Sequence, residues 1–186
     1  MKMARVYLEK LNLDTAKEVK LWENFTDERL QGYNYADLSD FEIKVWYGSL
    51  TSPLKKYFAV RKIDDDRFIG FLGLKQINYL KKKAKIGVVF DSAYTSRGYG
   101  LEGLDLLIDK AFSNMKFKEL SLDVNLFNTR AIATYKKLGF QITGEKKEVF
   151  ENQGIKFDER YFTKEAGIIY SKILEMKLTK DDYYGL

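Results

Sequence analysis

Three closely spaced glycines mark the stretch of this chain whose residue types most directly indicate chemistry. The stretch runs from Tyr94 to Gly103 and reads YTSRGYGLEG. It follows the β-branched run Ile86–Phe90 and precedes apolar residues at helical spacing. A glycine-rich turn between a strand and a helix lets main-chain N–H groups surround an anion, and the helix dipole adds positive potential. The loop therefore predicts a site for a phosphorylated ligand.

The spacing of the glycines also fits other interpretations. Gly98, Gly100 and Gly103 satisfy the dinucleotide pattern G-x-G-x-x-G, and Asp123 lies about 20 residues further on, as that pattern asks. A doubly wound fold, however, carries this motif after its first strand, whereas four predicted strands precede it here. An ATP-type P-loop is excluded because no Gly-Lys-Ser/Thr follows the glycines. A plain strand-to-helix turn, with Gly103 packing the helix, remains open.

The composition limits the chemistry further. The 186 residues, 45% of them hydrophobic and 15% aromatic, are expected to form one domain over residues 1–186. Cysteine and histidine are absent, which excludes thiolate catalysis, disulfides, a histidine general base and most transition-metal sites. We therefore expect no metal in the site.

The charge pattern bears on partners and location. The net charge of +5 is spread along the chain, which argues against a nucleic-acid partner. The densest cluster, Lys81–Lys83 with Lys85, is expected in solvent on a hairpin turn. No apolar run approaches the ~20 residues needed to span a bilayer, and no signal-peptide core follows Met1. These features predict a cytoplasmic protein without a membrane partner.

Apolar spacing predicts the elements that must position the loop. Strands are expected at Val6–Leu11, Tyr57–Ile63, Arg67–Ile77, Ala84–Asp91, Leu120–Val124, Phe140–Phe150 and near Ile168–Leu178. Helices are expected from Asp14 or Thr15, at Leu38–Leu50, from the glycine loop to about Asn114, and at Asn128–Leu138 with Gly139 as C-cap. This order predicts an α/β sandwich built on a mixed sheet.

A second motif lies one helix and one strand after the loop. It reads Val124-x-x-x-Asn128-x-x-Ala131-x-x-x-Tyr135-x-Lys137-Leu138-Gly139-Phe140. With both motifs, the chain resembles the GNAT family of N-acetyltransferases, most closely its ribosomal-protein and spermidine acetyltransferase-like branch. The family loop, Gln/Arg-x-x-Gly-x-Gly/Ala, aligns with Thr95–Gly100, while Phe68–Leu74 and Lys85–Gly87 resemble the third and fourth strands. The resemblance implies a GNAT fold: a mixed, mostly antiparallel sheet of about seven strands, with strands 4 and 5 splayed, and about four helices.

The resemblance also implies an activity. It implies transfer of the acetyl group of acetyl-CoA to a primary amine by direct attack in a ternary complex. The loop N–H groups would hold the pyrophosphate, and a main-chain N–H of the fourth strand would polarise the thioester carbonyl. Tyr135 would protonate the departing thiolate as the catalytic residue. The implied cofactor-binding residues are Val88, Val89, Phe90, Thr95, Ser96, Arg97, Gly98, Tyr99, Gly100 and Asn128.

Several assignments have alternatives. Asn128 also fits a helix N-cap, and Tyr135 also fits a core aromatic. Glu102 matches a family acid but equally suits the helix dipole in a first turn. Lys85 stands where many relatives carry a glutamate base, and a lysine of ordinary pKa cannot take that role. Water, Asp91 and Glu148 remain as routes for the proton, and a non-catalytic CoA-binding or interaction domain of the same fold remains the alternative function.

The acceptor is the least defined part of the site. In this fold the first two helices and the last strands line the acceptor side, which here would include Trp22, Tyr33, Tyr35, Trp46 and Tyr161. The acids Asp27, Glu28, Asp37 and Asp40 would either attract a cationic amine or form plain surface. The tract Glu151–Gly167 is longer than the hairpin of relatives and predicts a lid or a homodimer contact. A small-molecule amine, including a polyamine or an amino sugar, and a peptide N-terminus all remain open as acceptors.

Overall fold

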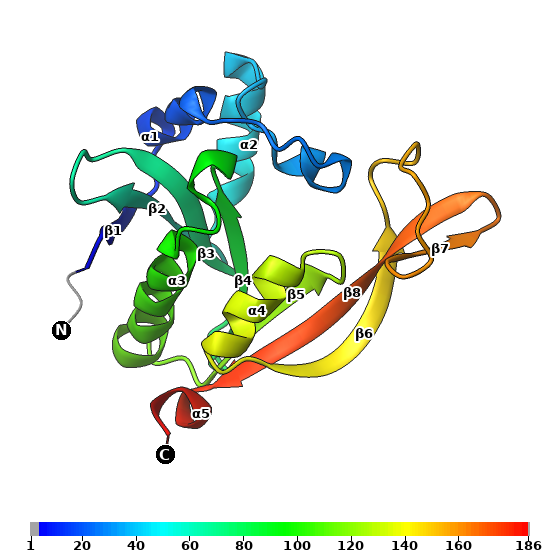
Figure 1. The fold of residues 1–186 in the computed structure, drawn as a ribbon. Helices are drawn as coiled ribbons and strands as arrows, with labels where there is room; N and C mark the ends of the chain where they lie inside the picture. The colour runs from blue at the N-terminus through cyan, green and yellow to red at the C-terminus, as the bar shows by residue number, and fades with distance from the viewer. Residues whose placement is uncertain (1–3, 186) are drawn as a thin grey trace.

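The computed structural model describes residues 4–185, which build one mixed sheet with helices packed on both faces (Figure 1). The strands are β1 Val6–Lys10, β2 Lys56–Lys62, β3 Phe68–Asn78, β4 Lys83–Phe90, β5 Glu119–Asn125, β6 Gln141–Val149, β7 Phe162–Glu165 and β8 Ile168–Thr179. The α-helices are α1 Leu13–Lys17, α2 Asp40–Leu50, α3 Tyr99–Asp109, α4 Thr129–Lys137 and α5 Lys180–Tyr184. Shorter turns are η1 Glu18–Leu21, η2 Glu28–Tyr33 and η3 Ser92–Tyr94, and a π-helical turn, Lys110–Asn114, continues α3.

The strand order is β1-β2-β3-β4-β5-β8-β6, and β7 pairs with β8. Every pair is antiparallel except β4 with β5. That parallel pairing joins only Lys83–Lys85 to Glu119–Ser121, although both strands continue beyond it. The expected mixed, mostly antiparallel sheet with splayed strands 4 and 5 is therefore confirmed. All seven expected strands are present, and β7 is an eighth that the sequence pattern did not indicate.

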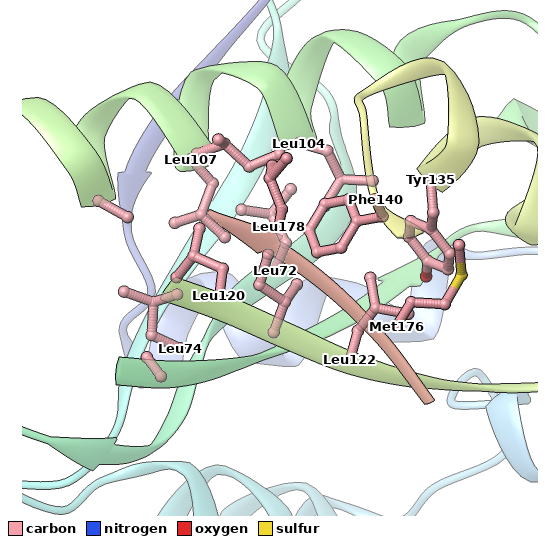
Figure 2. Packing of buried hydrophobic residues seen from close by; sticks show 14 of the residues in the cluster. Leu72, Leu74, Leu104, Leu107, Leu120, Leu122, Tyr135, Phe140, Met176 and Leu178 are labelled. Atoms are coloured by element: carbon pink, nitrogen blue, oxygen red, sulfur yellow. The ribbon is translucent and has the colours of Figure 1, made fainter. Parts of the chain in front are cut away.

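The larger core lies between the sheet and the helices α3 and α4. Alternate residues of a strand point to opposite faces, so Leu72 and Leu74 of β3 face these helices while Phe71 faces the other side. Figure 2 shows Leu104 and Leu107 of α3 directed toward the side chains of this cluster. The helix that follows the glycine loop is thus fixed on the centre of the sheet.

Gly103 lets α3 approach the sheet closely. A Cβ placed on this residue would lie 3.2 Å from Leu72 Cδ2 and 3.4 Å from Val60 Cγ1. The first distance is tighter than an ordinary van der Waals contact, so a side chain here would require Leu72 or the helix to move by a few tenths of an ångström. The prediction that Gly103 packs the helix is confirmed.

The helices α1 and α2 cover the opposite face of the sheet. Trp22, Ile43 and Phe71 are buried there, and Trp22 Nε1 donates to the Phe68 carbonyl at 2.9 Å. The Arg61 guanidinium ties this layer to the sheet, because it bonds Glu9 at 2.5 Å and Glu18 at 2.6 Å. None of the helices between residues 4 and 185 has the length and apolar character needed to cross a bilayer.

The lysine cluster near the β3–β4 turn is divided between solvent and sheet. Lys81, Lys82 and Lys83 are exposed, as expected for a hairpin turn. Lys85 lies inside β4 and is only partly exposed, which corrects the expectation that it shares the solvated turn. The reason is that β4 starts at Lys83, so Lys85 is held by strand pairing to Lys75.

Candidate active site

The glycine loop presents the unpaired N–H groups of a helix start. Ser96 and Gly98 have positive φ values of 61° and 86°, which turn the chain sharply into α3. The first helical bond runs from the Glu102 N–H to the Gly98 carbonyl at 3.2 Å. The N–H groups of Tyr99 and Gly100 therefore have no acceptor within the helix. Such groups, with the helix dipole, form an anion site.

The cap of α3 differs from the caps of the other helices. Side-chain oxygens of Asn12, Ser39, Asn128 and Thr179 accept N–H groups at the starts of α1, α2, α4 and α5. The N-cap of α3 is Gly98, which has no side chain to do this. A Cβ on Gly98 would also lie 2.9 Å from Arg5 Nη2, and its φ disfavours other residues. The loop thus leaves its N–H groups available to a ligand.

Arg5 holds the loop from the N-terminal side. Its Nε donates to Glu102 Oε1 at 2.8 Å, its Nη2 donates to the Arg97 carbonyl at 3.1 Å, and its guanidinium lies 4.6 Å from the Tyr99 ring centre. Glu102 is therefore an ion-pair partner in the first turn of α3. This placement favours a structural role for Glu102 over a catalytic one.

We expect the change Arg5→Ala to weaken acetyl-CoA binding several-fold, because the loop loses three contacts that hold its shape. The free energy of unfolding should fall by no more than about 1 kcal/mol, since the ion pair with Glu102 is partly exposed. Calorimetric titration and urea unfolding would measure the two effects. Lys17→Ala, which removes an exposed ion pair with Asp14, is the matched control. Unchanged binding in Arg5→Ala would show that the loop keeps its shape unaided.

A cavity of about 910 Å³ runs from the glycine loop past the separation of β4 and β5 to the side of α2. Nine of the eleven predicted site residues line it, namely Val88, Val89, Phe90, Thr95, Ser96, Gly98, Gly100, Asn128 and Tyr135. Arg97 and Tyr99 do not line it. The guanidinium of Arg97 lies over the Tyr94 ring, and the Tyr99 ring lies against Arg5. At these two positions only the main chain remains a candidate for ligand contact.

Tyr135 is both a core residue and a cavity residue. Its ring packs edge-on against Phe140, with 6.0 Å between ring centres, and Figure 2 shows it beside Phe140 and Met176. It also lines the cavity. Burial, with a smaller contribution from Tyr33, raises the pKa of the Tyr135 hydroxyl well above its ordinary value. The hydroxyl therefore carries a proton at any physiological pH.

Asn128 serves as the N-cap of α4. Its Oδ1 accepts the Ala131 N–H at 3.2 Å, so the capping alternative is present in the structure. Its Nδ2 is not needed for that bond and remains available as a donor, and the residue lines the cavity. A ligand contact through Nδ2 stays a prediction.

Basic residues of α4 also line the cavity, and sequence reasoning did not single them out. Arg130 lies next to the loop, with Nη1 3.4 Å from Ser96 Oγ, and Lys137 lies two turns further on. Arg130, Thr134 and Lys137 are spaced four and three residues apart, which places them on one helix face. This helical spacing is the sequence feature that could have indicated a shared basic face.

An ionic cluster lies at the parting of β4 and β5. Lys85 Nζ and Lys146 Nζ each lie 2.5 Å from Asp123 Oδ2, and Lys146 Nζ lies 2.6 Å from Glu148 Oε1. Burial raises the pKa of Asp123, but the hydrogen bonds from the two lysines outweigh it and lower the pKa overall. Asp123 and Glu148 both line the cavity. The lowered pKa of Asp123 makes this carboxylate a weak proton acceptor.

The other candidate base, Asp91, lies away from the cavity. Its side chain is buried, and Oδ1 accepts the N–H groups of Glu23 and Ala93 at 3.0 Å. These bonds cap the turn η3 and tie it to the end of η1, so Asp91 has a structural task. Within residues 4–185 no three potential metal ligands from His, Cys, Asp or Glu come together.

The acceptor side contains part of the expected aromatic set. Tyr33, Tyr35 and Trp46 line the cavity, whereas Trp22 and Tyr161 do not. Three of the four acids named for a cationic amine have local partners, because Asp27 pairs with Arg29, Asp40 pairs with Lys20, and Asp37 accepts from Asn24. The fourth, Glu28, lies outside this cavity. The surface interpretation of these acids therefore fits better than a role in binding a cation.

The turn η2 packs against the segment after β6 at this end of the cavity. Leu30 contacts the buried cluster of Phe127, Phe150, Ile155, Phe162 and Ile169. The Arg29 guanidinium lies 5.5 Å from the Phe127 ring centre, and a Cβ on Gly32 would lie 1.9 Å from Glu151 Oε1. Two segments far apart in the sequence thus meet beside the end of the cavity that α2 lines (Figure 1).

Comparisons with known proteins agree with this architecture. Spermidine N(1)-acetyltransferase of Escherichia coli K12 is 30% identical over 81 residues, which cover 44% of this chain and 44% of that enzyme, so the match spans less than half of the relative. The probable N-acetyltransferase YjcK of Bacillus subtilis 168 is 27% identical over 124 residues, covering 66% of this chain and 68% of that protein.

Solved structures support the fold over nearly the whole chain. The spermidine N-acetyltransferase of Vibrio cholerae, in complex with CoA and spermine, superposes with a TM-score of 0.75 at 17% identity, covering 98% of this chain and 99% of that one. Residues 8–161 match the family described as acetyltransferase (GNAT) domain. The chain therefore belongs to the GNAT acetyltransferase domain family.

Proposed function

We propose that this protein transfers the acetyl group of acetyl-CoA to a primary amine by direct attack within a ternary complex. One observation carries the proposal. The cavity joins the free N–H groups of the glycine loop to Tyr135 and an aromatic acceptor end, and it passes the point where β4 and β5 part. Membership of the GNAT family and the names of the relatives support the same activity.

The residues present fit the pyrophosphate of acetyl-CoA at the loop. A Cβ on Gly100 would meet Phe90 at 3.7 Å, an ordinary contact, so the protein leaves space above the start of α3. The N–H groups there would bind the pyrophosphate, while Arg130 and Lys137 would add positive charge.

The strand β4 would position the thioester that acetyl-CoA supplies. After Lys85 this strand is paired to β3 on one edge and, among residues 4–185, to no strand on the other. Main-chain N–H groups of Val88–Phe90 that face the open edge would donate to the carbonyl oxygen of the thioester. Tyr135 would give its proton to the departing sulfur, and the proton of the attacking amine would leave toward Glu148 or water.

Acetyl-CoA is expected to stabilise the folded protein against heat. At 100 times Kd the gain is about 2.7 kcal/mol, which for a chain of this length is roughly 5–10 °C in Tm. Thermal unfolding with and without acetyl-CoA measures it, and thiol release across a broad panel of amines then tests transfer. No shift with acetyl-CoA would overturn the proposal. A shift without turnover on any amine would favour a non-catalytic CoA-binding domain.

A further inference from the structure

We propose that the acceptor is a small amine with an apolar or aromatic body and an anionic group, and that Lys75 binds the anionic group. The inference rests on the proposed acetyl transfer and names the substrate class for the same site. It depends on the position of Lys75, the charge balance around it and the aromatic walls beside it.

Lys75 lies at the acceptor end of the cavity. It is on β3, directly paired with Lys85 of β4, so both side chains lie on the same face of the sheet. Alternation along β3 places Phe71 on that face as well, which is the face covered by α1 and α2. Lys75 lines the cavity and is only partly exposed. An acceptor that reaches the parting of β4 and β5 therefore passes its ammonium group.

The charges around Lys75 leave one cation uncompensated. The cluster has three ammonium groups, those of Lys75, Lys85 and Lys146, and two carboxylates, those of Asp123 and Glu148. Both carboxylates are bonded to Lys85 or Lys146, whereas the side-chain ammonium group of Lys75 has no hydrogen bond or ion pair within residues 4–185. Burial lowers the pKa of Lys75, with smaller lowering contributions from Lys85 and Lys55 and smaller raising contributions from Asp123 and Glu148. A carboxylate or phosphate on the acceptor would supply the missing partner.

The same balance disfavours a polycationic acceptor. A second ammonium group on the acceptor would face the Lys75 ammonium across a partly desolvated cavity, where like charges repel strongly. The acids at this end of the cavity do not offset this effect. Asp27, the N-cap of η2, bonds Arg29, and Asp40 of α2 bonds Lys20. Glu151 lies against Gly32 of η2 and is not among the charges that act on Lys75. The charge arrangement therefore selects against polyamines and for zwitterionic or anionic amines.

Aromatic rings provide the apolar wall. The ring centres of Tyr35 and Trp46 lie 4.9 Å apart, and those of Trp46 and Phe71 lie 5.0 Å apart. The Tyr57 ring lies on Gly73, where a Cβ would be 2.6 Å from Tyr57 Cδ1, so the glycine is required for this placement. All four rings line the cavity. Stacking or edge contacts with an aromatic acceptor are the interactions such a wall favours.

The enclosure of this end favours a small acceptor over a peptide. Leu30 and Tyr33 of η2 line the cavity, as does Phe25, which precedes η2. The turn η2 is held against the segment after β6 by Leu30 and by the contact of Gly32 with Glu151. In this proposal the packing of η2 limits the room for an extended peptide at this end. A free small amine needs less room.

The experiment compares amines that differ only by a carboxylate. Tyramine is compared with L-tyrosine, phenethylamine with L-phenylalanine, and spermidine serves as the polycation. Thiol release with acetyl-CoA gives kcat/KM, and calorimetry on the CoA-loaded protein gives binding of each amine. Lys75→Met removes the charge at similar length, Lys75→Arg retains it, and Lys81→Met changes an exposed lysine of the β3–β4 turn as the control.

We expect the carboxylated member of each pair to be favoured about tenfold or more by the unchanged protein. Lys75→Met should abolish that preference, Lys75→Arg should retain most of it, and Lys81→Met should retain all of it. A preference for tyramine, phenethylamine or spermidine would overturn the inference, as would a preference that survives Lys75→Met. Binding of none of the amines, with the acetyl-CoA shift intact, would also overturn it and leave the proposed function standing. Loss of the acetyl-CoA shift itself would overturn both.

Discussion

Replacing Tyr135 by phenylalanine is expected to lower turnover about 100-fold while leaving acetyl-CoA binding unchanged. Proton donation by a positioned side chain contributes about 10²–10⁴ in rate, and the lower end applies where water can substitute in part. The ring of Tyr135 packs on Phe140 and lines the cavity, so the variant keeps the packing and loses only the hydroxyl. Steady-state thiol release and the acetyl-CoA thermal shift measure the two properties separately.

The raised pKa of Tyr135 also predicts how the effect of Tyr135→Phe on turnover depends on pH. Burial raises that pKa above the ordinary value of about 10, so the hydroxyl stays protonated as the pH rises through the neutral range. The ratio of rates between Tyr135→Phe and the unchanged protein should therefore be constant between about pH 6 and pH 9. A ratio that approaches one at high pH would contradict a proton-donating role.

A matched control separates chemistry from stability. Tyr79→Phe removes an exposed hydroxyl that donates to the Pro53 carbonyl at 3.0 Å, far along the chain from the loop and α4. We expect full turnover in this control. Unchanged turnover in Tyr135→Phe as well would leave Tyr135 as a core aromatic and would mean that another group, such as water, protonates the departing thiolate.

Local patterns predicted the parts of the fold that short stretches of sequence determine. Leu120, Leu122 and Val124 alternate along β5, and the glycines of the loop impose their turn through their own backbone freedom. The strand β7 gave no such signal, because its four residues include a single buried one, Phe162, and it exists by pairing with β8. The segment η2 has no buried residue of its own, and long-range contacts through Leu30 and Gly32 position it.

In the candidate site too, some residues could be located from local sequence motifs, whereas others are brought together only by the pairing of the strands. The loop and α4 carry their own motifs, so Gly98, Gly100 and Tyr135 could be located before the fold was known. The acceptor end is assembled from separate strands, since Lys75 and Asp123 approach Lys85 only through the registers of β3, β4 and β5. Trp22 illustrates the limit of aromatic composition, because nothing in the sequence separates a ring that faces the core from one that faces a cavity. The register of the sheet makes that separation.

Replacing Leu72 by alanine is expected to lower the free energy of unfolding by about 3 to 5 kcal/mol, the range measured when a large buried leucine is truncated. Leu72 is fully buried at the centre of the main cluster (Figure 2) and lies directly beneath Gly103 of α3. The variant loses the transfer energy of the removed atoms and leaves a void that a close-packed helix cannot fill. This loss is a large fraction of the roughly 5–15 kcal/mol that stabilises a typical domain.

Urea unfolding measures this loss, with Leu80→Ala as the control, because Leu80 is 97% exposed and its truncation should change stability by less than about 0.5 kcal/mol. The helix α3 carries the loop N–H groups and packs on Leu72, so acetyl-CoA should bind only the folded protein. The substitution lowers the fraction of protein that is folded. If the loop keeps its shape, saturating acetyl-CoA should therefore increase the free energy of unfolding of Leu72→Ala by the same amount as it does in the unchanged protein. A smaller gain in the variant would show that the void also displaces α3, and a stability loss below 1 kcal/mol would place the core elsewhere.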